Sequence, residues 1–474
     1  MKSYPRFMLA AGASGSGKTM ITCGILQALK NRGMKVTSFK CGPDYIDPMF
    51  HEKVIHTRSG NLDTFFAGEE LTRYLFCQNA EGCDISVMEG VMGYYDGLGG
   101  FSTKASACDL AEVTNTPVIL VVNTRGMSLS TLAYIKGFLT FREPTRIQGV
   151  ILNQISPMLY PQMKEQIENE LGLQVCGYVP RMEDCSLESR HLGLVLPQEV
   201  EQLSEKLQHI ASVLEDTLDL DQIVEIGRKA GDVGYFEQAE KKICCFIEKA
   251  AEEAAGKKQI RIAVSKDEAF CFIYEANMQL LRAMGVELIP FSPIHDKKLP
   301  SADGVLFYGG YPELFAKELS ENEQMCRDVR EKITGGMPCM AECGGFMYLH
   351  RSMEDMEDRS WPMAGVIDGK AYRTKKLGRF GYIELEPADG CTKDHRIKGH
   401  EFHYFDSTSC GESYLAKKPL SRRSWHCIHE TETLMAGFPH LYYYSNPEFI
   451  LEFLRKCRRY QEREKSYRTE DERR

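Results

Sequence analysis

Short apolar runs alternate with amphipathic stretches along the first two hundred residues. The runs cover residues 7–11, 35–40, 85–88, 118–122 and 149–152, with helical spacing of apolar positions between them. The run at 118–122 is apolar without interruption, which is typical of a parallel strand buried on both faces. The alternation predicts an α/β fold in which helices flank a parallel sheet. Ligands of such sheets bind at the carboxyl ends of the strands, so the residues after each run are the first candidates for chemistry.

A second α/β pattern follows a helical stretch. From residue 198 to residue 258 the composition shifts to Glu, Lys, Gln and Ala at helical spacing, which predicts a helical connector. Apolar runs return at residues 260–264, 304–308 and 340–341. We therefore expect a first domain over 1–197, the connector and its linker over 198–258, a second α/β domain over 259–455 and a charged tail over 456–474.

Composition narrows the class of protein. The chain has 474 residues, of which 43% are hydrophobic and 26% charged, enough for two domains with ordinary cores. Its formal net charge of -9 argues against a nucleic-acid partner. No apolar run approaches the roughly 20 residues of a membrane helix, and no secretion signal precedes the first run, so we expect a cytoplasmic protein without a membrane partner. The 17 cysteines include no Cys-x-x-Cys pair, which favours reduced thiols.

A glycine-rich segment joins the first apolar run to the first helical stretch. It reads Gly-Ala-Ser-Gly-Ser-Gly-Lys-Thr and offers these residues for nucleotide binding: Gly12, Ser14, Gly15, Ser16, Gly17, Lys18 and Thr19. Glycines let backbone N–H groups point at phosphate oxygens, Lys18 supplies a positive charge, and the Thr19 hydroxyl is suited to bind Mg²⁺. The segment predicts a nucleoside triphosphate site but does not identify the phosphate acceptor.

Three carboxylates follow neighbouring strands of the predicted sheet. Asp44 and Asp47 lie in the turn-rich segment after the second apolar run, and Glu89 ends the third. Mg²⁺ takes a few hard oxygen ligands and leaves its other positions to water and phosphate. Thr19, one of the two aspartates and Glu89 therefore form a candidate metal set. The alternative for the aspartates is that they only cap a turn or a helix.

Several segments of the first half resemble the cobyrinic acid a,c-diamide synthase family. They are Gly-Pro-Asp-Tyr-Ile-Asp-Pro at 42–48, Glu-Gly-Val-Met-Gly-Tyr-Tyr-Asp-Gly at 89–97 and Arg-His-Leu-Gly-Leu at 190–194. The amino-terminal half of that family belongs with dethiobiotin-synthetase-like P-loop enzymes. The resemblance implies that ATP phosphorylates a substrate carboxylate, that Tyr45 and Ile46 orient this carboxylate, and that Asp96 contacts phosphate or substrate.

A second chemical centre is predicted around Cys343. The segment 338–349 reads as a buried strand that breaks into a helix, and Cys343 lies at the break, as a nucleophile does in a strand-to-helix elbow. A helix N-terminus at this point is expected to lower the pKa of the thiol. The region resembles the class I glutamine amidotransferases of the corrinoid branch, which implies that His440 is the base and that Gly310 and Tyr311 lie in the oxyanion loop. That branch lacks the glutamate that follows the histidine in many class I enzymes, so the resemblance implies a Cys–His dyad.

Together the two centres describe an amide ligase. The resemblance implies that ATP activates the a and c acetate carboxylates of cobyrinic acid as acyl phosphates, and that glutamine hydrolysis supplies the ammonia. The resemblance places this reaction in cobalamin biosynthesis. A polyanionic corrin requires a local basic rim, for which the candidates are Lys40, Lys104, Arg125, Arg190 and His191.

Alternatives stay open at this point. The same chemistry on nickel-sirohydrochlorin or hydrogenobyrinic acid is the nearer one. The more distant one is a regulatory P-loop ATPase with an inactive glutaminase domain. It is disfavoured because such switches carry an extra lysine early in the phosphate loop, and residues 12–16 contain none. A homodimer is the candidate assembly.

Overall fold

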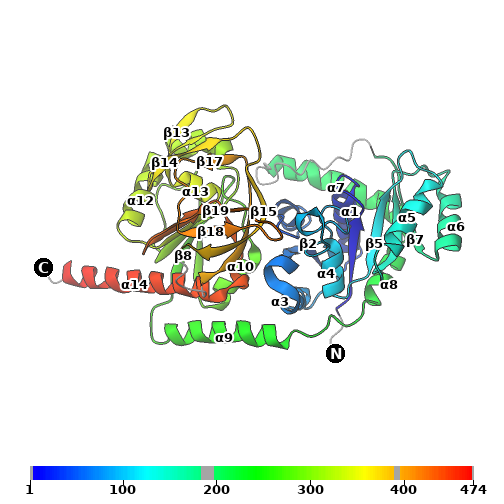
Figure 1. Ribbon diagram of the computed structural model, residues 1–474, viewed down its shortest axis with the longest axis horizontal. Helices are drawn as coiled ribbons and strands as arrows, with labels where there is room; N and C mark the ends of the chain where they lie inside the picture. Colours follow the sequence, from blue (N-terminus) through cyan, green and yellow to red (C-terminus); the bar gives the residue numbers. More distant parts are fainter. Residues whose placement is uncertain (1–3, 183–196, 389–394, 472–474) are drawn as a thin grey trace. The chain divides into compact units, whose positions relative to one another are not determined.

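The computed structural model describes residues 4–182, 197–388 and 395–471. The chain divides into two compact units, Met1–Glu240 and Lys241–Arg474 (Figure 1). Both are α/β, so the predicted fold class is confirmed. Within the described ranges, none of the helices combines the length and the apolar character that a membrane crossing requires.

The first unit is built on a seven-stranded parallel sheet with the order β3-β2-β4-β1-β5-β6-β7. Its strands are β1 (Arg6–Ala11), β2 (Val36–Cys41), β3 (Arg58–Leu62), β4 (Ile85–Glu89), β5 (Val118–Asn123), β6 (Ile147–Asn153) and β7 (Gln174–Val179). All residues of β1 are buried, which explains why it reads as a continuous apolar run. β1 lies between β4 and β5, so the segments after these strands meet at one edge of the sheet.

Helices cover both faces of this sheet. They are α1 (Lys18–Asn31), α2 (Ile46–Lys53), α3 (Thr64–Ala80), α4 (Ala107–Val113), α5 (Ser130–Thr140), α6 (Tyr160–Leu171), α7 (Pro197–Thr217) and α8 (Leu220–Arg228), and α9 (Glu237–Ala254) leads into the second unit. Residues of α1, α7 and α8 share one apolar core with alternate residues of β1. On β2, the ring of Phe39 packs at a tilt against that of Phe76 of α3, with 5.4 Å between the ring centroids. The helices α7 and α8, which fall in the expected connector, thus pack on the first unit.

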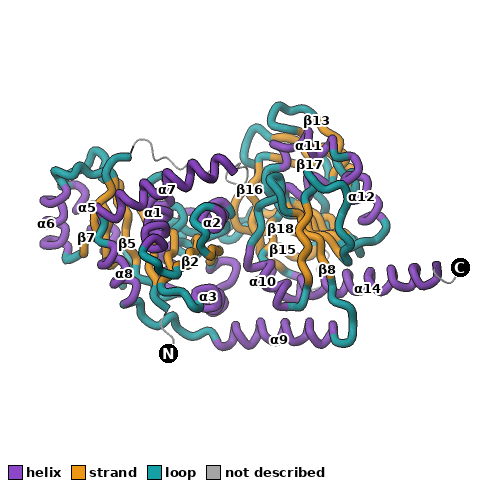
Figure 2. The backbone as a smooth tube through the Cα atoms, turned by 180° about the vertical axis from the view of Figure 1, so that it is seen from behind, coloured by secondary structure: helices purple, strands orange, loops and turns teal. Residues whose placement is uncertain are grey.

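The described residues of the second unit form three sheets, and their strands are drawn in orange in Figure 2. The first has the order β20-β21-β11-β10-β8-β9, the second β13-β12-β14-β17 and the third β19-β18-β15-β16-β22. The strands of the first sheet are β8 (Arg261–Ser265), β9 (Glu287–Phe291), β10 (Gly304–Phe307), β11 (Cys339–Glu342), β20 (His429–Glu430) and β21 (Leu434–Gly437). Those of the second sheet are β12 (His350–Glu354), β13 (Ser360–Pro362), β14 (Ile367–Arg373) and β17 (Phe405–Ser407). Those of the third sheet are β15 (Arg379–Pro387), β16 (Ile397–His403), β18 (Tyr414–Lys417), β19 (Ser424–Cys427) and β22 (His440–Leu441).

The helices of this unit are α10 (Glu275–Ala283), α11 (Ala316–Glu321), α12 (Glu323–Thr334), α13 (Gly344–Tyr348) and α14 (Pro447–Asp471). β10 pairs with both β8 and β11 in parallel, so the segments that follow β10 and β11 lie next to each other. Because Gly309 follows β10 and Cys343 follows β11, this pairing brings the two residues close together.

Candidate functional site

The phosphate-binding segment curls between β1 and α1. Gly15 and Gly17 have φ values of +75° and +89°, which favour glycine, and α1 begins directly after them at Lys18. Asn153, at the end of β6, donates a 2.9 Å hydrogen bond from Nδ2 to the carbonyl of Ser16. A Cβ on Gly17 would lie 2.4 Å from the same nitrogen. The loop is therefore held in place by a residue that the sequence did not single out.

Lys18 and Thr19 point in different directions from the start of α1. The Lys18 ammonium donates to the carbonyls of Ala13, at 3.1 Å, and Met92, at 2.6 Å. Burial and the neighbouring Lys40 ammonium lower the pKa of Lys18. Thr19 donates a 2.7 Å hydrogen bond from Oγ1 to Oε1 of Glu89. Two members of the predicted metal set are thus in direct contact.

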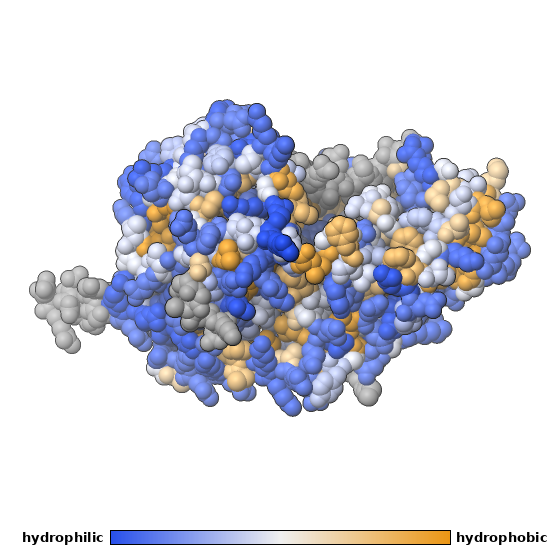
Figure 3. Space-filling view, viewed as in Figure 1, coloured by the Kyte–Doolittle hydropathy of each residue, from blue (hydrophilic) through white to orange (hydrophobic). Residues whose placement is uncertain are grey.

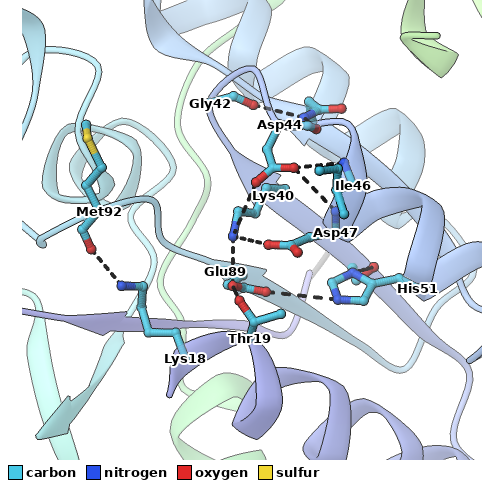
Figure 4. A network of polar contacts seen from close by, with 12 residues as sticks. Lys18, Thr19, Lys40, Gly42, Asp44, Ile46, Asp47, His51, Glu89 and Met92 are labelled. Atoms are coloured by element: carbon cyan, nitrogen blue, oxygen red, sulfur yellow. Dashed lines mark hydrogen bonds and ion pairs between the residues drawn. The ribbon is translucent and has the colours of Figure 1, made fainter. Parts of the chain in front are cut away.

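The three predicted carboxylates converge on Lys40, a residue of β2 (Figure 4). Its ammonium lies 2.7 Å from Oε1 of Glu89 and 3.9 Å from Oδ2 of Asp44, and it donates a short hydrogen bond to Asp47. Lys40 is only 5% exposed. The expectation that it belongs to a basic rim for the substrate is therefore wrong, because its charge is buried among carboxylates.

Burial sets the electrostatics of this cluster. It raises the pKa of Glu89 to about 7, against the opposing effect of Lys40, and burial together with Asp47 raises the pKa of Asp44. Burial acts to lower the pKa of Lys40, but Glu89 and Asp47 outweigh it and hold the pKa above its usual value. Lys40 is therefore a stable ammonium in this environment.

His51 of α2 contacts the same glutamate from the other side. Its Nε2 lies 4.0 Å from Oε2 of Glu89, and neither atom has a hydrogen-bond partner among the residues that the structure describes. The other ring nitrogen lies 3.1 Å from the Ser38 hydroxyl. Burial lowers the pKa of His51 to about 4, so the ring is neutral. The sequence analysis missed this histidine because the packing of α2 on β2 and β3 brings it to Glu89.

The oxygen groups fit Mg²⁺ in type. Thr19, Asp44, Asp47 and Glu89 all offer hard oxygen ligands, and one or two carboxylates together with nucleotide phosphates are a usual Mg²⁺ environment. Asp44 also caps α2, because its Oδ1 accepts from the amide of Ile46 at 2.8 Å. Across the described residues, no group of three His, Cys, Asp or Glu side chains is spaced to hold a metal as it stands. The Lys40 ammonium occupies the middle of the cluster.

The predicted substrate residues lie beside these groups. Tyr45 is buried and directly precedes α2, whereas Ile46 is partly buried at its start. Asp96 is exposed and accepts a 3.1 Å hydrogen bond from the amide of Gly93. A Cβ on Gly93 would lie 2.7 Å from the carbonyl of Gly12, so the turn that carries Asp96 touches the phosphate loop.

The remaining candidates for a basic rim differ in their surroundings. Lys104 forms a 3.0 Å ion pair with Asp109, and Arg125 is exposed. Arg190 and His191 lie outside the described residues.

Apolar side chains also reach the surface of the first unit (Figure 3). The loops after β4, β5 and β6 expose Phe101, Leu129 and Met158, respectively.

In the second unit, Cys343 stands between β11 and α13. Its φ and ψ of +47° and −106° are strained for a non-glycine residue, as expected of a nucleophile at a strand-to-helix elbow. A Cβ built on Gly309 would lie 3.4 Å from Cβ of Cys343 and 2.4 Å from Cε1 of His440. Cys343 and His440 therefore flank the same glycine.

The resting pair is neutral. Burial, helped by Glu313 and Glu401, raises the pKa of the Cys343 thiol, and burial together with His400 lowers the pKa of His440. The Gly344 amide at the start of α13 acts to lower the thiol pKa, as expected of a helix N-terminus, but burial outweighs it, so the pKa of Cys343 is raised rather than low. A neutral imidazole next to a thiol can accept its proton.

A buried glutamate accompanies this pair. Oε2 of Glu342 lies 3.8 Å from Nδ1 of His440, and burial raises the pKa of this carboxyl. The Tyr443 hydroxyl lies 3.5 Å from Oε1 of Glu342 and 3.0 Å from the Tyr308 hydroxyl. The ring of His440 also stacks on that of His400, with 4.9 Å between centroids. The sequence offered a signal for Glu342, because it is a glutamate at the end of an apolar strand, as Glu89 is.

The backbone around Gly310 forms the rest of this centre. Gly310 has a φ of +157°, and a Cβ on it would lie 2.1 Å from the carbonyl of Ala269. Its nitrogen lies 3.3 Å from the position of a Cβ on Gly344. The Tyr311 amide donates a 2.9 Å hydrogen bond to the Ala269 carbonyl, so it is already engaged. The Gly310 amide thus lies close to Gly344, the residue that follows Cys343 and whose amide contacts its thiol.

Comparison with known proteins agrees with the division of the chain into two units. Residues 7–195 match the CobQ/CobB/MinD/ParA nucleotide binding domain, and residues 261–445 match the CobB/CobQ-like glutamine amidotransferase domain. A cobyrinate a,c-diamide synthase of Caldanaerobacter subterraneus subsp. tengcongensis is 40% identical over 95% of this chain and 98% of its own. The enzyme of the same name from Listeria innocua is 38% identical over 94% of this chain and 98% of its own. The enzyme of this name from Picrophilus torridus is 35% identical over 95% of this chain and 98% of its own.

Proposed function

Because the chain belongs to the cobyrinate a,c-diamide synthase family, a family of amidotransferase-type ligases, we propose that it converts the a and c acetate carboxylates of cobyrinic acid to amides, using ATP and glutamine. The observation that carries the proposal is the presence in one chain of a phosphate loop followed by Thr19, which bonds Glu89, and a cysteine elbow at Cys343 that flanks Gly309 together with His440. One centre activates a carboxylate, and the other supplies nitrogen.

The first reaction takes place at the phosphate loop. A substrate carboxylate oxygen attacks the γ-phosphorus of ATP, the bond to the β-phosphate oxygen breaks, and an acyl phosphate and ADP result. Positioning and charge neutralisation dominate such transfers. The amides of the loop and Lys18 neutralise the phosphates, and Tyr45, Ile46 and Asp96 position the substrate. Mg²⁺, held by Thr19, Glu89 and Asp44 or Asp47, would neutralise further negative charge on the phosphates.

Ammonia comes from glutamine at the second centre. His440 takes the proton of the Cys343 thiol, and the sulfur attacks the side-chain amide carbon of glutamine. The amides of Gly310 and Gly344 stabilise the negative charge that develops on the oxygen, and His440 returns the proton to the departing ammonia. Water then hydrolyses the thioester to glutamate. Ammonia attacks the acyl phosphate, and phosphate leaves.

Surface chemistry supports a macrocyclic substrate. Phe101, Leu129 and Met158 are 100%, 61% and 88% exposed, and they lie on the loops that follow strands at the edge where the phosphate loop lies. Apolar side chains suit the face of a tetrapyrrole ring, whereas the exposed Arg125 suits its carboxylates.

The purified protein tests this proposal directly. It is incubated with ATP, Mg²⁺, glutamine and, in parallel, cobyrinic acid, hydrogenobyrinic acid or nickel-sirohydrochlorin. Mass spectrometry should show two successive replacements of a hydroxyl by an amino group on cobyrinic acid. Amidation of another tetrapyrrole in preference to cobyrinic acid would overturn the proposed substrate, and no amidation of any of them would overturn the proposed reaction.

A further inference from the structure

The most unusual feature of the first centre is that a protein cation occupies its carboxylate cluster. The Lys40 ammonium contacts Asp47 and Glu89 directly, and Asp44 at 3.9 Å. Figure 4 shows the three carboxylates pointing at this one nitrogen. A buried carboxylate needs a partner charge or hydrogen bonds, and here Lys40 supplies the charge.

These carboxylates are also the groups expected to bind Mg²⁺. A divalent ion and an ammonium require the same oxygens, so both cannot occupy the middle of the cluster. We propose that Lys40 is an internal counter-ion, which holds Asp44, Asp47 and Glu89 together in the nucleotide-free protein and is displaced when the metal enters with ATP. This inference rests on the proposed function because the metal is the one that accompanies ATP.

Two further contacts agree with an exchange of cations. Glu89 uses Oε1 for both Lys40 and Thr19. Its Oε2 is buried, has no hydrogen bond from the described part of the chain and stays available as a ligand. Lys18 provides a second ammonium nearby, which donates to the backbone carbonyls of Ala13 and Met92. Lys40 reaches the cluster through a flexible four-carbon stem, so its ammonium can move without a shift of β2.

A consequence is that metal and nucleotide binding are coupled. Without nucleotide, the metal must displace an ammonium from buried carboxylates, and the displaced charge has no anion to receive it. With nucleotide, phosphate oxygens offer both the metal and the ammonium new partners. By linkage, the nucleotide strengthens metal binding by the same factor as the metal strengthens nucleotide binding.

Calorimetry with Mn²⁺ on the nucleotide-free full-length protein tests this role. Lys40→Met removes the ammonium, and we expect it to bind Mn²⁺ at least about tenfold more tightly than the wild type at pH 8. Lys40→Gln, whose amide can still donate to the carboxylates, is the second neutral variant if Lys40→Met does not fold. Lys40→Arg keeps the charge and should show no gain. Lys164→Met removes a half-buried lysine of α6 that pairs with Glu168, and should match the wild type.

Addition of ADP completes the test. Mn²⁺ affinity should rise with ADP more in the wild type than in the neutral variants, since only the wild type has an ammonium to displace. Neutral variants that bind Mn²⁺ no more tightly than the wild type would overturn the role of Lys40. No tetrapyrrole or glutamine is present in these titrations. If the titrations show no gain in Mn²⁺ affinity, the proposed amidation is therefore unaffected. If the protein fails to amidate cobyrinic acid, a measured gain in Mn²⁺ affinity still supports the role of Lys40.

Discussion

Gly309 offers the sharpest prediction for the second centre, because any side chain there enters the space between Cys343 and His440. In Gly309→Ala the new Cβ would lie 2.4 Å from Cε1 of His440, whereas ordinary contacts begin at 3.4 Å. His440 must therefore move by about 1 Å. A misplacement of about 1 Å in a catalytic geometry can lower the rate about 100-fold, equivalent to about 2.7 kcal/mol of transition-state stabilisation.

The assay compares two nitrogen sources. We expect kcat for glutamine hydrolysis to fall about 100-fold in Gly309→Ala, while ammonia-dependent amidation stays near the wild-type rate, because the phosphate loop is unaltered. Gly378→Ala is the matched control, since a Cβ on Gly378 meets nothing within 4 Å. Glutamine hydrolysis by Gly309→Ala within about twofold of the wild type would refute the placement of His440 against this glycine.

Three further predictions address other parts of the chain. Glu89→Gln should lower synthesis from both glutamine and ammonia at least about 100-fold while glutamine hydrolysis continues, and a fully active variant would contradict its role at the first centre. Asn153→Ala removes the hydrogen bond to Ser16 and should weaken ADP binding by about threefold to tenfold in calorimetry; unchanged affinity would contradict its role in fixing the loop. Burial lowers the pKa of His350 to about 4, below the value near 6.5 of the unfolded chain. The protein therefore has its full free energy of unfolding above pH 6.5, where His350 is neutral in both the folded and the unfolded chain. As the pH falls toward 4 the unfolded chain takes up the proton first, which lowers the free energy of unfolding by an amount on the order of 2 kcal/mol at pH 5. Chemical denaturation at pH 7 and pH 5 should show a smaller decrease in the free energy of unfolding for His350→Gln than for the wild type. Equal decreases would contradict the assignment of this pH dependence to His350.

The parts of the fold that the sequence predicted share one physical property. β1, β2, β4, β5 and β6 lie inside a parallel sheet, so they appear as apolar runs. The edge strand β3, Arg58–Leu62, and the other edge strand β7, Gln174–Val179, were missed. β3 is mostly exposed or half-buried and includes a glycine, so its pairing with β2 has no local signature. The antiparallel strands β15 and β16 depend similarly on partners that are distant in sequence.

The candidate site divides in the same way. Lys18 and Cys343 were predicted because local sequence determines a strand-to-helix turn and its side chain. His51 and Glu342 were not assigned to these centres, and Lys40 was assigned to a basic rim instead of the carboxylate cluster, because their roles depend on neighbours from other strands. A charged residue near the end of a buried strand was nevertheless a usable signal, since burial of a charge requires a specific partner.

The nitrogen source used by Cys343→Ala tests the central claim most directly. The variant retains the phosphate loop and Glu89 but lacks the thiol that attacks glutamine. We predict that amidation of cobyrinic acid with glutamine is lost, while amidation with ammonia continues near the wild-type rate. Continued glutamine-dependent amidation, or loss of amidation with ammonia in a folded variant, would contradict the division of the reaction between the two centres.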